Sequence, residues 1–158
     1  MCALETKHPE RDYFEEPFAT LGKVFSTLSD ISYDELYPLK PYLKRLTLTP
    51  GDVLWRQGDP PDGLYIVESG VLRATYEFAE HTQNMEETMF PGTLAGELSG
   101  LSDTPRNATV VVEHPAVLWK LSSENLCQLR REEPTLATAF THLVLKCKSR
   151  LQLTVNKY

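Results

Sequence analysis

The apolar positions near the start of the chain follow a helical spacing. Residues 17–28 carry apolar side chains at steps of three and four residues, which places them on one face of a helix. Pro17 suits the first turn of that helix. A second helical stretch is predicted at residues 33–37, and Pro38 and Pro41 should end it within a turn or two. The apolar face of the first helix consists of Phe18, Leu21, Val24, Phe25 and Leu28.

Between residues 46 and 121 the spacing becomes that of short strands. Runs rich in β-branched and aromatic residues alternate with turns of Gly, Pro and Asp, a pattern typical of a closed or sandwiched all-β unit. Such turns supply positive φ angles or a proline kink. We predict strands at residues 46–48, 53–55, 63–67, 71–78, 87–89, 108–112 and 116–121. The predicted turns are Pro50-Gly51, residues 58–63, Ser69-Gly70 and Pro91-Gly92.

After residue 121 the helical spacing returns. Ser122 or Ser123 offers an N-cap for a helix that Pro134 ends, and a further helix starts there. An apolar stripe from residue 136 to residue 151, with basic residues beside it, predicts a long terminal amphipathic helix. The stripe consists of Leu136, Phe140, Leu143, Val144, Cys147 and Leu151.

The length of 158 residues fits one domain of ordinary size. We expect a polar N-terminal segment, residues 1–16, that suits a linker. The domain itself should cover residues 17–158. Its predicted parts are helices at 17–41, a β-roll at 46–121 and C-terminal helices at 122–158.

Charge and cysteine content exclude several classes of protein. The formal net charge of −6 disfavours a nucleic-acid partner, because coating phosphates takes concentrated Lys and Arg. Cys2, Cys127 and Cys147 lack the spacing of a disulfide framework or a zinc site, which favours a reducing, cytoplasmic location. No apolar run approaches the ~20 residues that cross a bilayer. We therefore expect no direct membrane insertion, although the chain suits the cytosolic end of a larger protein.

The segment of residues 92–109 carries the clearest chemistry in the chain. Glycines at its entry, a helical turn at residues 98–101 and a return through Arg106 would present N–H groups and a guanidinium to one point. That arrangement suits a phosphate. Glu97 would repel a bare anion, but it can accept a hydrogen bond from a hydroxyl of the same ligand. A sugar phosphate has both groups, so Glu97 and Arg106 predict a ribose-phosphate clamp.

The run GELSGLSDTPRNATV, residues 96–110, resembles the phosphate-binding cassette of the cyclic-nucleotide-binding domain family. The family pattern is approximately GELAL, a short loop and PRAATV, and the spacing from Glu97 to Arg106 agrees without insertion. Supporting matches lie in the two Gly-Asp turns at residues 51–52 and 58–59 and in the run of residues 64–72. The resemblance covers about residues 46–121. It implies a mainly β fold with flanking helices, a jelly-roll β-sandwich or double-stranded β-helix.

A narrower likeness involves residues 58–63, 68–74 and 145–146. These resemble the cyclic-nucleotide-binding-like tail of fungal sulfate-permease-type anion transporters, in which the tail follows a membrane domain and a STAS domain. The likeness implies those transporter domains, or self-association, as partners. It also implies a place at the cytosolic face of a membrane transporter.

The family resemblance assigns a role to each position of the cassette. It implies cyclic AMP or cyclic GMP as the ligand and no cofactor, with Glu97 on the ribose 2′-hydroxyl and Arg106 on the cyclic phosphate. Ala108 would line the pocket, while Asn107 or Thr109 faces the base edge. A residue of the last helix would cap the base, namely Phe140, Leu143 or Leu151. The implied binding residues are Gly96, Glu97, Leu98, Ser99, Arg106, Asn107, Ala108 and Thr109.

Some positions depart from the family pattern or admit a structural explanation. Ser99 and Gly100 replace apolar residues that are usual in that short helix, and Gly100 should loosen it by roughly 1 kcal/mol relative to Ala. Asn107 stands where the family usually has Ala or Thr, and Asp103 adds a negative charge beside the expected phosphate. Arg106 has an alternative role in a structural salt bridge to Glu97 or Asp103. Larger aromatic residues are expected in the core rather than at a ligand. They are Trp55, Tyr65 and Trp119. The apolar stripe of residues 136–151 is likewise expected in the core, as the alternative to a cap over the base.

Two functions remain as hypotheses. The first is a regulatory module, not an enzyme, in which a bound nucleotide pulls the helices toward the sandwich. The second is a degenerate module that keeps the fold as an interaction or assembly surface. A cupin-like metalloenzyme would need converging histidines, but the four histidines are dispersed, and no helix-turn-helix that would read DNA is expected after the long helix. The histidines are His8, His81, His114 and His142.

Overall fold

The computed structural model describes residues 17–28, 31–78, 84–148 and 152–156. The predicted N-terminal segment, residues 1–16, lies outside the described residues, as does Leu151. Within the described part, no helix is long and apolar enough to cross a membrane.

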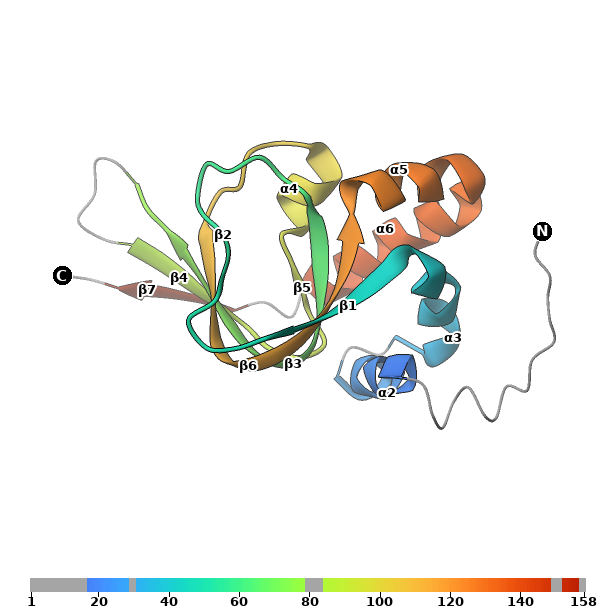
Figure 1. The fold of residues 1–158 in the computed structure, drawn as a ribbon, viewed down its shortest axis with the longest axis horizontal. Helices are drawn as coiled ribbons and strands as arrows, with labels where there is room; N and C mark the ends of the chain where they lie inside the picture. The colour runs from blue at the N-terminus through green and yellow to red at the C-terminus, as the bar shows by residue number, and fades with distance from the viewer. Residues whose placement is uncertain (1–16, 29–30, 79–83, 149–151, 157–158) are drawn as a thin grey trace.

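The described strands form one antiparallel sheet of seven, which curls into a roll (Figure 1). The strand order is β1-β6-β3-β4-β7, with β2 paired to β6 and β5 paired to β3. Figure 1 shows most of the helices at one end of the roll, and β4 and β7 at the other. The strands are β1 (Leu43–Leu48), β2 (Val53–Trp55), β3 (Gly63–Tyr76), β4 (Asn84–Met89), β5 (Leu94–Ala95), β6 (Thr109–Ser122) and β7 (Gln152–Asn156).

The two long strands replace pairs of shorter ones that the sequence predicts. β3 joins the strands predicted at 63–67 and 71–78 and ends at Tyr76, and β6 joins those predicted at 108–112 and 116–121 and begins at Thr109. The predicted turn at Ser69-Gly70 is instead an irregular stretch within β3, where the register to β6 shifts. Gly70 has φ +88°, and a Cβ there would lie 2.5 Å from the Cα of Ala116. Glycine therefore serves the close approach of two strands rather than a reversal of the chain.

The helices at both ends of the chain largely match their prediction. The first helix has the predicted bounds, and the side-chain oxygen of Ser122 caps α5 by accepting from the N–H of Asn125. Pro38 and Pro41 do not end the second stretch, because it continues as a 3₁₀ helix. The helices are α2 (Pro17–Leu28), α3 (Tyr33–Leu36), η1 (Tyr37–Tyr42), α4 (Glu97–Ser102), α5 (Ser123–Glu132) and α6 (Pro134–Lys148).

The prediction of helices throughout residues 122–158 is wrong at its end. α6 stops at Lys148, and residues 152–156 form β7, which pairs with β4 in antiparallel register. Two of the five residues, Thr154 and Val155, are β-branched and favour a strand. Pairing with β7 also covers the edge that β4 would otherwise expose.

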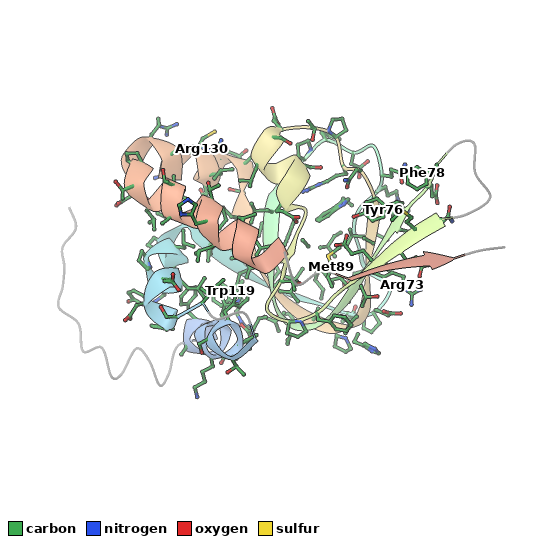
Figure 2. The ribbon with its side chains drawn as sticks, turned by 180° about the vertical axis from the view of Figure 1, so that it is seen from behind. Arg73, Tyr76, Phe78, Met89, Trp119 and Arg130 are labelled. Atoms are coloured by element: carbon green, nitrogen blue, oxygen red, sulfur yellow. The ribbon has the colours of Figure 1, made fainter. Side chains whose placement is uncertain are left out.

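The buried side chains form two clusters that share strands β3 and β6. One cluster packs α2, α3, α5 and α6 against one end of the roll, and the other fills the roll itself. Trp119, labelled in Figure 2, belongs to the first cluster. The ring of Phe18 meets it edge-on at 5.2 Å between centroids. Its Nε1–H donates to the buried carboxylate of Glu68 at 2.8 Å. The expected core role of Trp119 is confirmed.

Candidate functional site

A cavity of about 320 Å³ opens into the roll beside α4. Six of the eight predicted binding residues line it, which brings the Glu97 and Arg106 side chains to one site. The lining residues are Trp55, Ala74, Tyr76, Glu87, Met89, Leu94, Gly96, Glu97, Ser99, Arg106, Asn107, Ala108 and Val110.

The guanidinium of Arg106 is buried in the cavity wall, with 2% of the residue exposed. Nη2 donates to Oδ1 of Asp62 at 2.8 Å and to the carbonyl of Gly63 at 2.7 Å. Nη1 donates to the carbonyl of Gly96 at 3.1 Å. Among the described residues Nε has no hydrogen-bond partner. A buried cationic N–H without a partner costs about 1–3 kcal/mol, so an anionic oxygen from a ligand would be favourable there.

The ring of Trp55 packs against one face of the Arg106 guanidinium. The Arg106 Cζ lies 3.8 Å from the centroid of the Trp55 ring, a stacked cation–π geometry. Trp55 is also buried and belongs to the core of the roll. The sequence prediction that assigned Trp55 to the core is therefore confirmed, and the ring is a cavity wall as well.

Asp62 anchors Arg106 from outside the predicted segment. The Asp62 carboxylate also accepts from Nζ of Lys120 at 2.9 Å. Partial burial raises the pKa of this carboxyl, but the hydrogen bonds and charges of Lys120 and Arg106 outweigh burial and hold it below its usual value. The ion pair of Arg106 is thus with Asp62 rather than with either carboxylate that the sequence suggested.

The entry to α4 requires a glycine. Gly96 has φ +76°, and a Cβ there would lie 2.7 Å from Cη2 of Trp55. The close approach places the first turn of α4 beside the guanidinium of Arg106. Glu97, the next residue, is 8% exposed and lines the cavity.

The departures from the family pattern have structural roles in α4. Gly100 lies against β3, since a Cβ there would be 2.9 Å from the carbonyl oxygen of Gly63. Ser99 donates its hydroxyl hydrogen to the carbonyl of Pro105 at 3.1 Å. Asp103 has φ +59° at the end of α4, and its backbone N–H donates to the carbonyl of Ser99. Asp103 is exposed and does not line the cavity.

Some predicted contacts lie away from the cavity, and two are not described. Thr109 is not in the cavity wall, because its Oγ1 accepts from the backbone N–H of Gln57 at 2.9 Å. The side chain of Leu98 is not described. Phe140 and Leu143 are buried in the helical core, as the core alternative for this stripe predicts, and not in the cavity wall. The cap at Leu151 lies outside the described residues.

The strands β3 and β4 supply cavity residues that the sequence reasoning missed. Ala74 and Tyr76 from β3 and Glu87 and Met89 from β4 line the cavity (Figure 2 labels Tyr76 and Met89). The Oη of Tyr76 donates to Oε1 of Glu87 at 2.6 Å. Alternation along a strand could have placed 74 with 76 and 87 with 89 on common faces. It could not have shown which face turns inward, because a polar Glu on β4 reads as a solvent-facing residue.

Within the described residues, no group of three or more His, Cys, Asp and Glu side chains converges to hold a metal ion.

Comparison with known proteins gives a consistent result. Residues 45–133 match the model of a family described as the cyclic nucleotide-binding domain. The chain is 38% identical over 84 residues to the acetyltransferase Pat of Mycolicibacterium smegmatis, a match that covers 53% of this chain and 25% of that protein. It is 39% identical over 75 residues to the cAMP-dependent protein kinase type II regulatory subunit of Drosophila melanogaster, covering 48% and 19%. The matched region thus spans a quarter or less of these curated relatives.

A solved structure supports the fold over nearly the whole chain. The crystal structure of a cyclic nucleotide-binding domain from Methylobacillus flagellatus superposes with a TM-score of 0.70 at 21% identity. The superposition covers 90% of this chain and 89% of the other. Together with the antiparallel sheet and the flanking helices, this confirms the predicted jelly-roll fold.

Proposed function

Because the chain belongs to the cyclic nucleotide-binding domain family, we propose that it is a regulatory module whose cavity binds a purine ribose cyclic phosphate without catalysing a reaction. One observation carries the proposal: the buried guanidinium of Arg106 and the buried carboxylate of Glu97 line the same cavity. An anion and a hydroxyl on one ligand would match these two groups.

Arg106 would hold the cyclic phosphate. Its Nε–H is buried without a partner among the described residues, and a phosphate oxygen is a strong acceptor for a guanidinium N–H. Asp62, Trp55 and two backbone carbonyls already fix the guanidinium plane. Little side-chain entropy would therefore be lost on binding. The backbone N–H groups of Leu98 and Ser99 would assist.

Glu97 would accept a hydrogen bond from the ribose 2′-hydroxyl. Glu97 directly follows Gly96, whose carbonyl accepts a hydrogen bond from Nη1 of Arg106. Ala108 is 3% exposed and lines the cavity, so it would pack against the sugar. Asn107 is the exposed residue at the cavity rim and would face the base edge.

Ligand binding would regulate the position of the C-terminal helices. β5 leads directly into Gly96 and α4, and α6 contacts β5. A ligand that contacts α4 would therefore favour one arrangement of β5 and α6 over another. The name of one relative, a regulatory subunit of a cAMP-dependent protein kinase, supports a regulatory role.

Thermal unfolding with and without millimolar cyclic AMP or cyclic GMP tests the proposal. A ligand at about 100 times its dissociation constant adds roughly 2.7 kcal/mol, which should raise the midpoint by several degrees. Glu97→Gln and Arg106→Ala should each reduce this shift. Arg73→Ala is the matched control, because Arg73 is an exposed arginine of β3 paired with Glu113. A shift that survives Arg106→Ala in a folded variant would contradict the proposed phosphate contact.

The bonds already made by Arg106 favour a second candidate function. The terminal nitrogens of Arg106 donate to Asp62, Gly63 and Gly96. The arginine therefore also holds these segments together in the fold. A module of this kind would keep the fold as an interaction surface, for self-association or for a transporter with a STAS domain. The relatives named above are not transporters, so the fungal transporter tail and the cytosolic face of a membrane stay predictions. No thermal shift with either nucleotide, together with concentration-dependent sedimentation, would favour this candidate.

A further inference from the structure

The β3 and β4 strands place a second polar pair in the cavity, apart from the residues proposed to hold ribose and phosphate. Tyr76 and Glu87 both line the cavity, with Ala74 and Met89 beside them on the same face of the two strands. The phenol of Tyr76 donates to Oε1 of Glu87 at 2.6 Å. Figure 2 labels Tyr76, which comes from β3, and Met89, which comes from β4.

Glu87 is a buried carboxylate, with 6% of the residue exposed. Burying a carboxylate is costly unless hydrogen-bond donors compensate. Its neighbours in the wall include the apolar Ala74 and Met89, which offer no donor. A carboxylate accepts up to about four hydrogen bonds, so Glu87 can accept from donors on a ligand in addition to the donors that it already has, Tyr76 among them.

The tyrosine keeps its proton at neutral pH. Burial raises the pKa of Tyr76, and the hydrogen bond and charge of Glu87 and the charge of Glu97 raise it further. The phenol therefore remains a donor to Glu87 and fixes one carboxylate oxygen in place. The pair offers a ligand acceptors rather than a positive charge, and a phosphate would be repelled here.

On the basis of the proposed function, we propose that Glu87 selects the base of the nucleotide and that the cavity prefers cyclic GMP to cyclic AMP. The edge of guanine presents N1–H and the N2 amino group side by side, two donors that match the two oxygens of one carboxylate. The corresponding edge of adenine presents the N6 amino group next to the N1 lone pair. One oxygen of Glu87 would face that lone pair, which disfavours adenine.

Isothermal titration of the full chain with cyclic GMP and cyclic AMP tests this inference. We expect cyclic GMP to bind at least about tenfold more tightly, the discrimination typical of a bidentate contact to a base. Glu87→Gln should weaken cyclic GMP binding and bring the two affinities within about threefold of each other. Tyr76→Phe should reduce the preference less, because it removes only the group that positions the carboxylate.

Glu86→Gln is the matched control. It changes the same residue type by the same charge one position away on β4, where the side chain does not line the cavity. This variant should keep the preference for cyclic GMP.

The outcomes separate the base preference from the proposed function. Binding that depends on Arg106 but favours cyclic AMP, or a Glu87→Gln variant that weakens both nucleotides equally, would overturn the role of Glu87 and leave the proposed function standing. Absence of binding by either nucleotide in the folded wild-type protein would overturn both.

Discussion

Arg106 joins segments that lie far apart in the sequence. Its hydrogen bonds reach Asp62 just before β3, Gly63 at the start of β3 and Gly96 before α4. Its guanidinium also stacks on Trp55 of β2. Because the arginine is buried and Asp62 is exposed to solvent, the energy of this pair lies between that of a surface salt bridge and that of a buried one.

A double-mutant cycle measures that pair. We expect Asp62→Ala to lower the free energy of unfolding by about 1 kcal/mol. This effect should shrink in an Arg106→Lys background, where the Nη2 donor of the planar guanidinium is lost. Urea unfolding of the four proteins gives the coupling energy. Additive effects would show that Asp62 contributes nothing to holding the guanidinium. Asp59→Ala is a control, because Asp59 lies in the same turn but its carboxylate accepts from the backbone N–H of Arg56 rather than from the Arg106 guanidinium.

Tyr76 makes a prediction about alkaline pH. A tyrosine whose pKa is raised in the folded state keeps its proton where the unfolded chain loses one. The stability from this protonated phenol is fully present below pH 10.0, the ordinary tyrosine value, and is lost as the pH rises toward the folded value. We expect the unfolding free energy to fall between about pH 9 and 11, and less steeply in Tyr76→Phe. Urea unfolding midpoints of the wild type and of Tyr76→Phe, measured across this pH range, test the prediction. If stability fell equally steeply with pH in both proteins, the raised pKa of Tyr76 would be contradicted.

At the scale of single elements, α4 illustrates how packing overrides propensity. From helix propensity alone, Gly100→Ala should stabilise α4 by about 1 kcal/mol. The structure predicts the opposite sign, because the added Cβ would lie 2.9 Å from the Gly63 carbonyl oxygen and 3.1 Å from Cβ of Leu64. We expect a loss of about 1–3 kcal/mol, typical of overpacking.

Chemical denaturation of Gly100→Ala checks this sign. Ser102→Ala is a suitable control, because residue 102 is exposed in the same helix and the change brings no new contact with β3. A Gly100→Ala protein more stable than wild type would mean that α4 moves away from β3 without cost.

The sequence predicted the elements better than it predicted their ends. The periodicity located α2, β2 and α5 because each has a clear apolar pattern or cap. It divided β3 at Ser69-Gly70, since local turn chemistry cannot reveal that β6 lies close enough to require a glycine. It missed β7 because pairing with β4 is a long-range contact. The same limit applies to the cavity: the spacing of Glu97 and Arg106 was informative, whereas Asp62 and Glu87 reach the site only through the fold.

At the scale of the whole molecule, β3 and β6 connect the two buried clusters. Neighbouring residues of β3 face different clusters, with Ile66 in the helical one and Val67 in the roll. In β6, Leu118 belongs to the roll and Trp119 to the helical cluster. Because the strands are common to both, neither cluster can lose its packing without disturbing the backbone that supports the other.

The two tryptophans make this coupling measurable, since the chain has only Trp55 and Trp119 and they lie in different clusters. In Trp55→Phe the fluorescence of Trp119 reports the helical cluster, and in Trp119→Phe that of Trp55 reports the roll. For each variant, we expect the fluorescence transition in urea to coincide with its own far-ultraviolet circular dichroism transition, as two-state unfolding requires.

Phe18→Ala, which removes the ring packed on Trp119, should lower the free energy of unfolding by about 3–5 kcal/mol. When placed in the Trp119→Phe background, it should also shift the Trp55 transition, although Phe18 belongs to the other cluster. If the urea midpoint of the Trp55 transition stayed unchanged while the helical circular dichroism signal was lost at lower urea, the two clusters would unfold independently. Ligand binding in the cavity could then not act through shared packing on the helices that it is proposed to regulate.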